Sequence, residues 1–229
     1  EDILVVDPSG GRETRLLEPG ITVDEAALEA LIRRVKDLAR SSALVILAGS
    51  LPRGCREDLY ACLVGEIRRV GTRVFLDADG EALRQAVAAG PDLIKLNLEE
   101  FAALTGRQVR SPGDLVLLGR GEVQGRGALV VTLGAHGAVW VGAEAALLAE
   151  PPLIAPLMTV GSGDAFLGGY ATAVLRGEDI REALALGVAA GTANTLCLGP
   201  GVVDPAVVES LRGRVRVTPI GSAASMGHL

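Results

Sequence analysis

The residues best suited to chemistry lie in one stretch, Thr159–Tyr170, which reads TVGSGDAFLGGY. Three small residues, Gly161, Ser162 and Gly163, precede Asp164 at the start of an Ala- and Gly-rich helical pattern. Small residues let backbone N–H groups converge, and a helix N-terminus adds a positive dipole end, so this stretch suits a phosphoryl group in transfer. Asp164 could then accept the proton of an attacking hydroxyl. The alternative is an ordinary helix start that Asp caps.

The same stretch lacks two common phosphate-binding fingerprints. No Gly-Lys-Ser/Thr follows it, so it is not a Walker A loop. Phe166 stands where a dinucleotide fingerprint needs its third glycine. Any phosphate chemistry here therefore follows another pattern.

A second candidate is the pair Asn97 and Glu100, at the point where an apolar strand gives way to a helix. An amide and a carboxylate at that position could orient the water shell of Mg²⁺ and the phosphates. Asn at an N-cap with Glu three residues later also resembles a capping box. From these residues alone we favour the cap.

A third candidate is the turn after the strand at 128–132, where Thr132 is followed by Gly134 and Gly137. A nucleotide could lie against this bare backbone, with the threonine hydroxyl donating a hydrogen bond. The stretch could equally be a tight turn. His136 lies inside it, and we expect an exposed turn histidine.

These residues must be positioned by the elements around them. Continuous apolar strands alternate with amphipathic helices, which predicts parallel strands covered by helices and an α/β fold. Ligands bind such sheets beyond the carboxyl ends of the strands. The predicted strand–helix pairs are 43–48 with 56–70, 73–76 with 81–89, and 93–96 with 98–105.

The rest of the chain is predicted in the same way. A helix over 24–39 is capped by Thr22 or Asp24, and two strands, 3–6 and 14–17, flank a turn at 8–11. The remaining predictions are strands at 128–132, 138–141, 145–148 and 215–218, helices at 164–176, 180–196 and 205–211, and a loose tail at 221–229.

Composition excludes several functions. The net charge is −6 with scattered basic residues, which argues against nucleic acid as a partner. The longest apolar run, Ala43–Ala48, is too short to span a membrane. Cys55, Cys62 and Cys197 form no C-x-x-C pair, and with two histidines they predict no zinc site, so we expect a reduced, cytoplasmic protein.

Taken in order, the motifs N-x-x-E, V-T-L-G-x-x-G and V-G-S-G-D-A resemble those of the ribokinase-like (PfkB) carbohydrate kinases. The loop Gly49-Ser50-Leu51-Pro52 and the stretch Leu76–Leu83 are similar to the hexose-phosphate branch, which contains 1-phosphofructokinase and tagatose-6-phosphate kinase. The resemblance implies a three-layer α/β/α fold with a mostly parallel central sheet.

The resemblance also implies roles for the candidate residues. Asp164 would be the catalytic base, and Mg²⁺ would accompany ATP. The other implied roles are an anion hole at Gly161, Ser162 and Gly163, Mg²⁺ and phosphate binding at Asn97 and Glu100 through water, and nucleotide binding at Thr132, Gly134, Gly137 and Asn194.

The sequence departs from the family pattern in places. Leu96 stands where the family often has Pro, and 157–159 lacks a usual polar residue. The family's opening stretch, with a substrate-binding Asp and lid strands, has no counterpart, and the chain opens at Glu1 almost directly on a strand. We therefore expect an N-terminally truncated chain: 1–20 a remnant of the lid, 21–219 the nucleotide-binding core and 220–229 a flexible tail.

The expected activity is ATP-dependent phosphorylation of a sugar phosphate. Fructose 1-phosphate is the first candidate, with tagatose 6-phosphate and fructose 6-phosphate behind it. The alternatives are a kinase of a non-phosphorylated sugar or nucleoside, against which Ser162 argues because those branches more often have Ala, and a non-catalytic nucleotide-binding fragment. We expect this chain alone to bind MgATP weakly, and a longer parent protein could pair as a homodimer.

Overall fold

The computed structural model describes residues 2–7, 12–18, 20–124 and 127–221. Its centre is a seven-stranded sheet in which the strands lie side by side in the order of the sequence. Strands β3 to β6 are parallel, and β7, β8 and β9 are each antiparallel to the strand before them, so most strands still point the same way. The strands are β3 (Leu44–Ala48), β4 (Arg73–Asp77), β5 (Leu93–Asn97), β6 (Ala128–Thr132), β7 (Ala138–Val141), β8 (Ala146–Glu150) and β9 (Arg216–Pro219).

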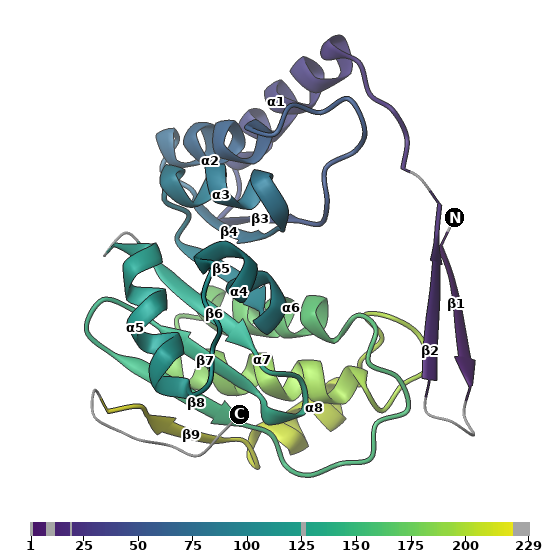
Figure 1. Cartoon of the computed structure of the whole chain (residues 1–229), viewed down its shortest axis with the longest axis vertical. Coiled ribbons are helices and arrows are strands. Elements are labelled where there is room, and N and C mark those ends of the chain that lie inside the picture. The colour runs from purple at the N-terminus through teal and green to yellow at the C-terminus, as the bar shows by residue number, and fades with distance from the viewer. Residues whose placement is uncertain (1, 8–11, 19, 125–126, 222–229) are drawn as a thin grey trace.

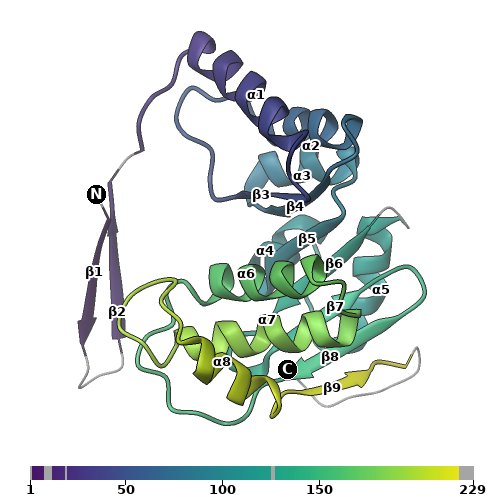
Figure 2. The same ribbon diagram turned by 180° about the vertical axis from the view of Figure 1, so that it is seen from behind.

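Helices cover both faces of this sheet (Figures 1 and 2). Strand residues alternate between two apolar clusters: Leu76 and Leu96 pack with α1 to α5, whereas Phe75 and Leu93 pack with α6 to α8. The predicted three-layer α/β/α fold is confirmed. The helices are α1 (Glu25–Ala39), α2 (Leu59–Arg69), α3 (Gly80–Ala89), α4 (Leu98–Thr105), α5 (Pro112–Val123), α6 (Ser162–Leu175), α7 (Ile180–Asn194) and α8 (Pro205–Arg212).

Local signals explain where several helices begin and end. The Asp24 carboxylate accepts the N–H of Ala27 at 2.8 Å, so Asp24 rather than Thr22 caps α1. Gly90 and Gly106 end α3 and α4 in the left-handed conformation, with φ of 73° and 64°. These caps bring the chain back toward the sheet after each helix.

Helix α5 was not predicted. Its start carries a capping box, in which Ser111 and Asp114 exchange side-chain and backbone hydrogen bonds, with Pro112 at the first position. Glycines inside the helix obscured its apolar pattern. Gly119 has a packing reason, since a Cβ there would lie 2.9 Å from a methyl of Leu129 on β6. The glycine therefore lets α5 lie close against the sheet.

Two other boundaries differ from the prediction. Helix α2 begins at Leu59, because residues 56–58 form a turn. Helix α6 begins at Ser162, two residues earlier than expected, so the small residues of the motif belong to its first turn. The earlier start of α6 matters for function, because it places Ser162 and Gly163 in the first turn of the helix.

A separate two-stranded antiparallel ribbon, β1 (Asp2–Asp7) and β2 (Arg12–Leu17), stands to one side of the α/β body (Figures 1 and 2). The predicted turn at 8–11 and the tail at 222–229 lie outside the described residues. The interpretation of residues 1–20, which include this ribbon, as a remnant of the lid stays a prediction. No helix within the described ranges combines the length and apolar character that a bilayer crossing requires.

Candidate active site

Polar residues lie at or near the carboxyl ends of three neighbouring strands, on the sheet face that α6 covers. Phe75, Leu93 and Val130 belong to the apolar cluster under α6 and α7, and side chains of a strand return to the same face every second residue. Asp77, Lys95 and Thr132 follow these three residues at that spacing. Because parallel strands end at one edge of the sheet, these polar groups gather beside the N-terminus of α6.

The N-terminus of α6 is built on Gly161, its N-cap, at φ 83°. A Cβ at this position would lie 2.7 Å from the amide nitrogen of Gly201 and 2.8 Å from Cα of Pro200. Glycine is therefore required by both the dihedral angle and the close approach. The first turn presents N–H groups that have no acceptor within the helix, together with the positive end of its dipole.

Asp164 is the third residue of α6, and its side chain is exposed. The N-cap is Gly161, and no side-chain capping bond forms there. The alternative in which Asp164 caps the helix is therefore wrong. An exposed carboxylate beside the open N–H groups of a helix can accept a proton from a ligand held there.

A buried ion pair lies beneath this turn. Lys95 Nζ is 2.6 Å from Oδ2 of Asp77, with side-chain exposures of 9% and 12%. A Cβ on Gly163 would lie 2.9 Å from the same Nζ, so the ammonium reaches the first turn of α6. Burial raises the pKa of Asp77, Lys95 opposes that rise, and the negative charge of Asp164 adds to it.

Lys95 and Asp77 were not predicted as site residues. The available signal was a lysine inside the apolar strand Leu93–Asn97, because a charge in a buried strand requires a partner. That partner lies on the neighbouring strand β4, where the sheet register and not the sequence brings it close.

Asn97 and Glu100 form the predicted capping box at the start of α4. The Asn97 side chain accepts the N–H of Glu100 at 2.8 Å, and Oε2 of Glu100 accepts the N–H of Asn97 at 2.7 Å. The cap interpretation is confirmed. It does not exclude a second role, because the other oxygen of Glu100 is not used in the box.

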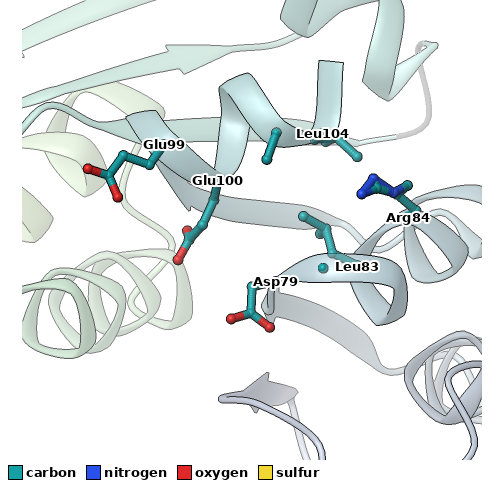
Figure 3. A pocket seen from close by; sticks show the side chains of 8 residues that line it. Asp79, Leu83, Arg84, Glu99, Glu100 and Leu104 are labelled. Atoms are coloured by element: carbon teal, nitrogen blue, oxygen red, sulfur yellow. The ribbon is translucent and has the colours of Figure 1, made fainter. Parts of the chain in front are cut away.

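Glu100 also lines an open cavity of about 230 Å³ between α3 and α4 (Figure 3). The carboxylates of Glu100 and Asp79 lie toward one end of it, and Arg84 lies at the other. The described residues contain no group of three or more side chains placed to hold a metal ion. A magnesium ion here would take most of its ligands from water and phosphate, as this ion commonly does.

The β6–β7 connection is the tight turn that the sequence allowed. Leu133 donates its N–H to the carbonyl of Gly137 at 2.8 Å, and His136 is exposed as expected. A Cβ on Gly137 would overlap the carbonyl oxygen of Ala149, so this buried glycine serves packing against β8. Gly134 is exposed, and nothing lies within 4 Å of where its Cβ would be. The open face of the turn is therefore at Gly134.

Asn194 is fully buried at the end of α7. Its Nδ2 donates to the carbonyl of Val160 at 2.9 Å and to Oγ of Ser162 at 3.3 Å. Its Oδ1 accepts the N–H of Gly201 at 2.8 Å. The amide thus joins the loop before α6 to the loop after α7, which is a positioning role beside the predicted anion hole.

Fold and site together define a class of protein: an α/β phosphotransferase-type domain with a glycine-lined helix N-terminus and an exposed carboxylate. The chain belongs to the pfkB family of carbohydrate kinases, which matches residues 5–206.

Individual relatives agree with this family. The chain is 35% identical to 1-phosphofructokinase of Rhodobacter capsulatus over 94% of its own length, and 32% identical to ATP-dependent 6-phosphofructokinase isozyme 2 of Escherichia coli over 83%. It spans 69% and 62% of these two proteins. Structures of phosphofructokinase-2 from Escherichia coli, one with substrates and products and one of a tetrameric inhibited form, match with TM-scores of 0.86 and 0.83 at 29% and 28% identity. Each match covers 93% of this chain and 70% or 69% of the solved one.

Proposed function

We propose that this chain carries the nucleotide and phosphoryl-transfer site of an ATP-dependent kinase that acts on a sugar phosphate. Fructose 1-phosphate is the first candidate acceptor, and tagatose 6-phosphate and fructose 6-phosphate follow. The observation that carries the proposal is the exposed carboxylate of Asp164 on the first turn of α6, beside a glycine-lined helix N-terminus. The names of the two relatives support the choice of a phosphorylated ketohexose.

In this proposal Asp164 accepts the proton of the acceptor hydroxyl as that oxygen attacks the terminal phosphorus. The N–H groups of Gly163 and its neighbours in the first turn of α6 stabilise the charge on the transferred group. Thr132 and the open backbone at Gly134 lie along the nucleotide. Asn194 holds the loop at Val160 in place without touching the nucleotide, because its amide is buried and hydrogen-bonded within the protein.

Magnesium belongs to the proposal as the ion that accompanies ATP and neutralises phosphate charge. Glu100 and Asn97 would hold it through water. They fit this indirect role, because the capping box fixes both side chains while leaving one oxygen of Glu100 unused. Two or fewer protein carboxylates plus phosphate oxygens are the usual ligand set of Mg²⁺ in such sites.

The test has two stages. Calorimetry of this chain should detect MgATP binding, and the absence of binding would overturn the proposal. A coupled ADP-release assay then compares the three sugar phosphates, with this chain and with the product of the complete gene side by side. Faster turnover with fructose 1-phosphate than with the other two is the expected order.

The same assay separates the two alternatives. Turnover that is faster with unphosphorylated fructose, ribose or a nucleoside would favour the other branches of the family. MgATP binding without transfer to any acceptor, in the complete gene product as well, would mean a nucleotide-binding protein without catalysis. Ser162 argues for the sugar-phosphate branch, and its hydroxyl is used within the protein, where it donates to the carbonyl of Thr159 at 2.7 Å.

Assembly and location are also proposals. We propose a cytoplasmic protein that self-associates. The three cysteines are free thiols, which suits a reducing compartment, and a tetrameric form is described for the Escherichia coli relative. Light scattering on a sizing column gives the molar mass directly, and a monomer at all concentrations would contradict self-association.

A further inference from the structure

An open cavity of about 620 Å³ lies at the edge of the sheet opposite the candidate active site. Strand β6 runs toward that site and β7 runs back from it, so the β7–β8 turn and the end of β9 lie at the far edge. Helix α5 and strands β8 and β9 stand on the side of the body away from the β1–β2 ribbon (Figures 1 and 2). None of the residues that line this cavity takes part in the proposed phosphoryl transfer.

The cavity has an apolar lining. Leu147 and Ile220 are buried there, and Trp140 on β7 is half-buried. A Cβ on Gly142 would overlap the Trp140 ring, so glycine at that position leaves room for the indole. An indole offers a flat apolar face on which the ring of a ligand can pack.

Two arginines line the same cavity from separate elements, Arg120 on α5 and Arg181 near the start of α7. Within the described ranges neither guanidinium forms an ion pair, and each donates to a backbone carbonyl. Arg120 donates to the carbonyl of Glu144 at 3.2 Å, and Arg181 donates to that of Val217 at 3.1 Å. A guanidinium has five N–H donors, so most of the donors here are left for another acceptor.

Arg120 is the more informative of the two. Its residue is half-buried, and its Nε is closed to solvent without a hydrogen-bond partner among the described residues. A buried donor without a partner is rare in folded proteins and calls for a bound ion, a water or a function. Glu144 is the one carboxylate of the lining, so the two arginines leave the cavity with a net positive charge.

We propose that this cavity is a second ligand site, which takes a small phosphate monoester with an aromatic or apolar body. The guanidinium groups of Arg120 and Arg181 bind the phosphate, and the body packs over Trp140 and Leu147. A phosphate monoester carries close to two negative charges, which matches two guanidinium groups that bind its oxygens through paired hydrogen bonds. The volume is also within the usual range of small-molecule sites. This inference is independent of the proposed kinase function.

The sequence supplies its own reporter, because Trp140 is the single tryptophan of the chain. Titration with phenyl phosphate should change the tryptophan emission saturably, with a Kd of about 1 mM or tighter. Inorganic phosphate and phenol each keep one half of this probe and should bind about 10-fold more weakly or worse. Benzoate has a single charge and should also bind more weakly. Tighter binding of any of the three would contradict the proposed ligand class.

Variants place the probe in the cavity. Arg120→Met and Arg181→Met should each weaken phenyl phosphate binding about 10-fold or more, the usual worth of a charged hydrogen bond. Arg216→Met is the matched control, because Arg216 lies at the other end of β9, where it pairs with Glu150 at 2.9 Å. It should bind the probe as the wild type does. Arg181 is exposed, so its variant keeps the test available even if Arg120→Met does not fold.

Three results would overturn the inference. The first is an absence of phenyl phosphate binding by both tryptophan emission and saturation-transfer NMR. The second is equal affinity in the wild type and Arg181→Met. The third is displacement of the probe by MgATP, which would place it in the candidate active site.

Discussion

At the scale of single residues, position within a helix decides what a carboxylate can do. Asp164 and Asp24 both lie near the start of a helix. Asp24 is an N-cap, and its carboxylate accepts the N–H of Ala27. Asp164 is two residues beyond the first residue of α6 and keeps its carboxylate exposed. The first arrangement serves stability, and the second leaves a base available to a ligand.

Asp164→Asn should lower the rate of phosphoryl transfer by roughly two to four powers of ten, the usual worth of a positioned general base. MgATP affinity and melting temperature should change little, because this carboxylate does not cap α6. Initial rates, calorimetry and thermal unfolding on one preparation check all three. A variant that unfolds readily, yet keeps its activity per folded molecule, would show a structural role only.

Glu100→Gln should shift the Mg²⁺ titration of activity to higher concentration while costing little stability, since glutamine can still accept the N–H of Asn97 as a box residue. Glu100→Ala should in addition lose about 0.5 to 2 kcal/mol of stability. Asp114 closes the second capping box, on α5, and Asp114→Asn is the matched control. An unchanged Mg²⁺ titration in Glu100→Gln would assign this glutamate to the cap alone.

At the scale of elements, the sequence predicts those helices and strands that depend on residues close together in the chain. Apolar runs and caps located the strands and most helices to within a few residues. Helix α5 was missed although Ser111 and Asp114 carry a capping-box signature, because its glycines dilute the apolar pattern. The Asp77–Lys95 pair could not be predicted in this way, because neighbouring strands and their register bring together residues that are far apart in the sequence.

The glycine that begins α6 should be irreplaceable. Gly161→Ala places a side chain at φ 83° and against Gly201, so we expect a loss of MgATP binding and a destabilisation of about 1 to 2 kcal/mol or more. Gly177, just beyond the other end of α6, has φ 76° with open space around it. Gly177→Ala carries similar backbone strain without the clash, and should lose stability while binding MgATP normally. Equal loss of binding in both variants would mean that strain alone is responsible.

At the scale of the whole molecule, the sheet has an open side. Strand β3 is an end strand of the seven-stranded sheet, and among the described strands it pairs with β4 alone. Ile46 in the middle of β3 is 41% exposed. An apolar edge with unpaired backbone groups favours pairing with another chain.

Ile46→Lys should therefore reduce concentration-dependent association, because a charged side chain on an edge strand opposes pairing. Sedimentation velocity at several concentrations measures this, and MgATP binding should be unaffected. Leu117 is more exposed, at 74%, but lies on helix α5, which has no open edge. If Leu117→Lys lowers association as much as Ile46→Lys does, general surface hydrophobicity is the cause.

The hydrogen bonds of Asn194 also make the complete loop before α6 depend on a segment that comes later in the chain. They tie Val160 and Ser162 to Gly201, and the ribosome makes these segments one after another. A nascent chain that ends before Pro200 can already bond Asn194 to Val160 and Ser162, yet Oδ1 of Asn194 lacks the N–H of Gly201, and Gly161 lacks the backbone against which it packs. Nucleotide that binds only the finished loop stabilises only finished chains, by mass action. With the proposed ATP binding, ATP in the cell would thus favour completed molecules over unfinished ones.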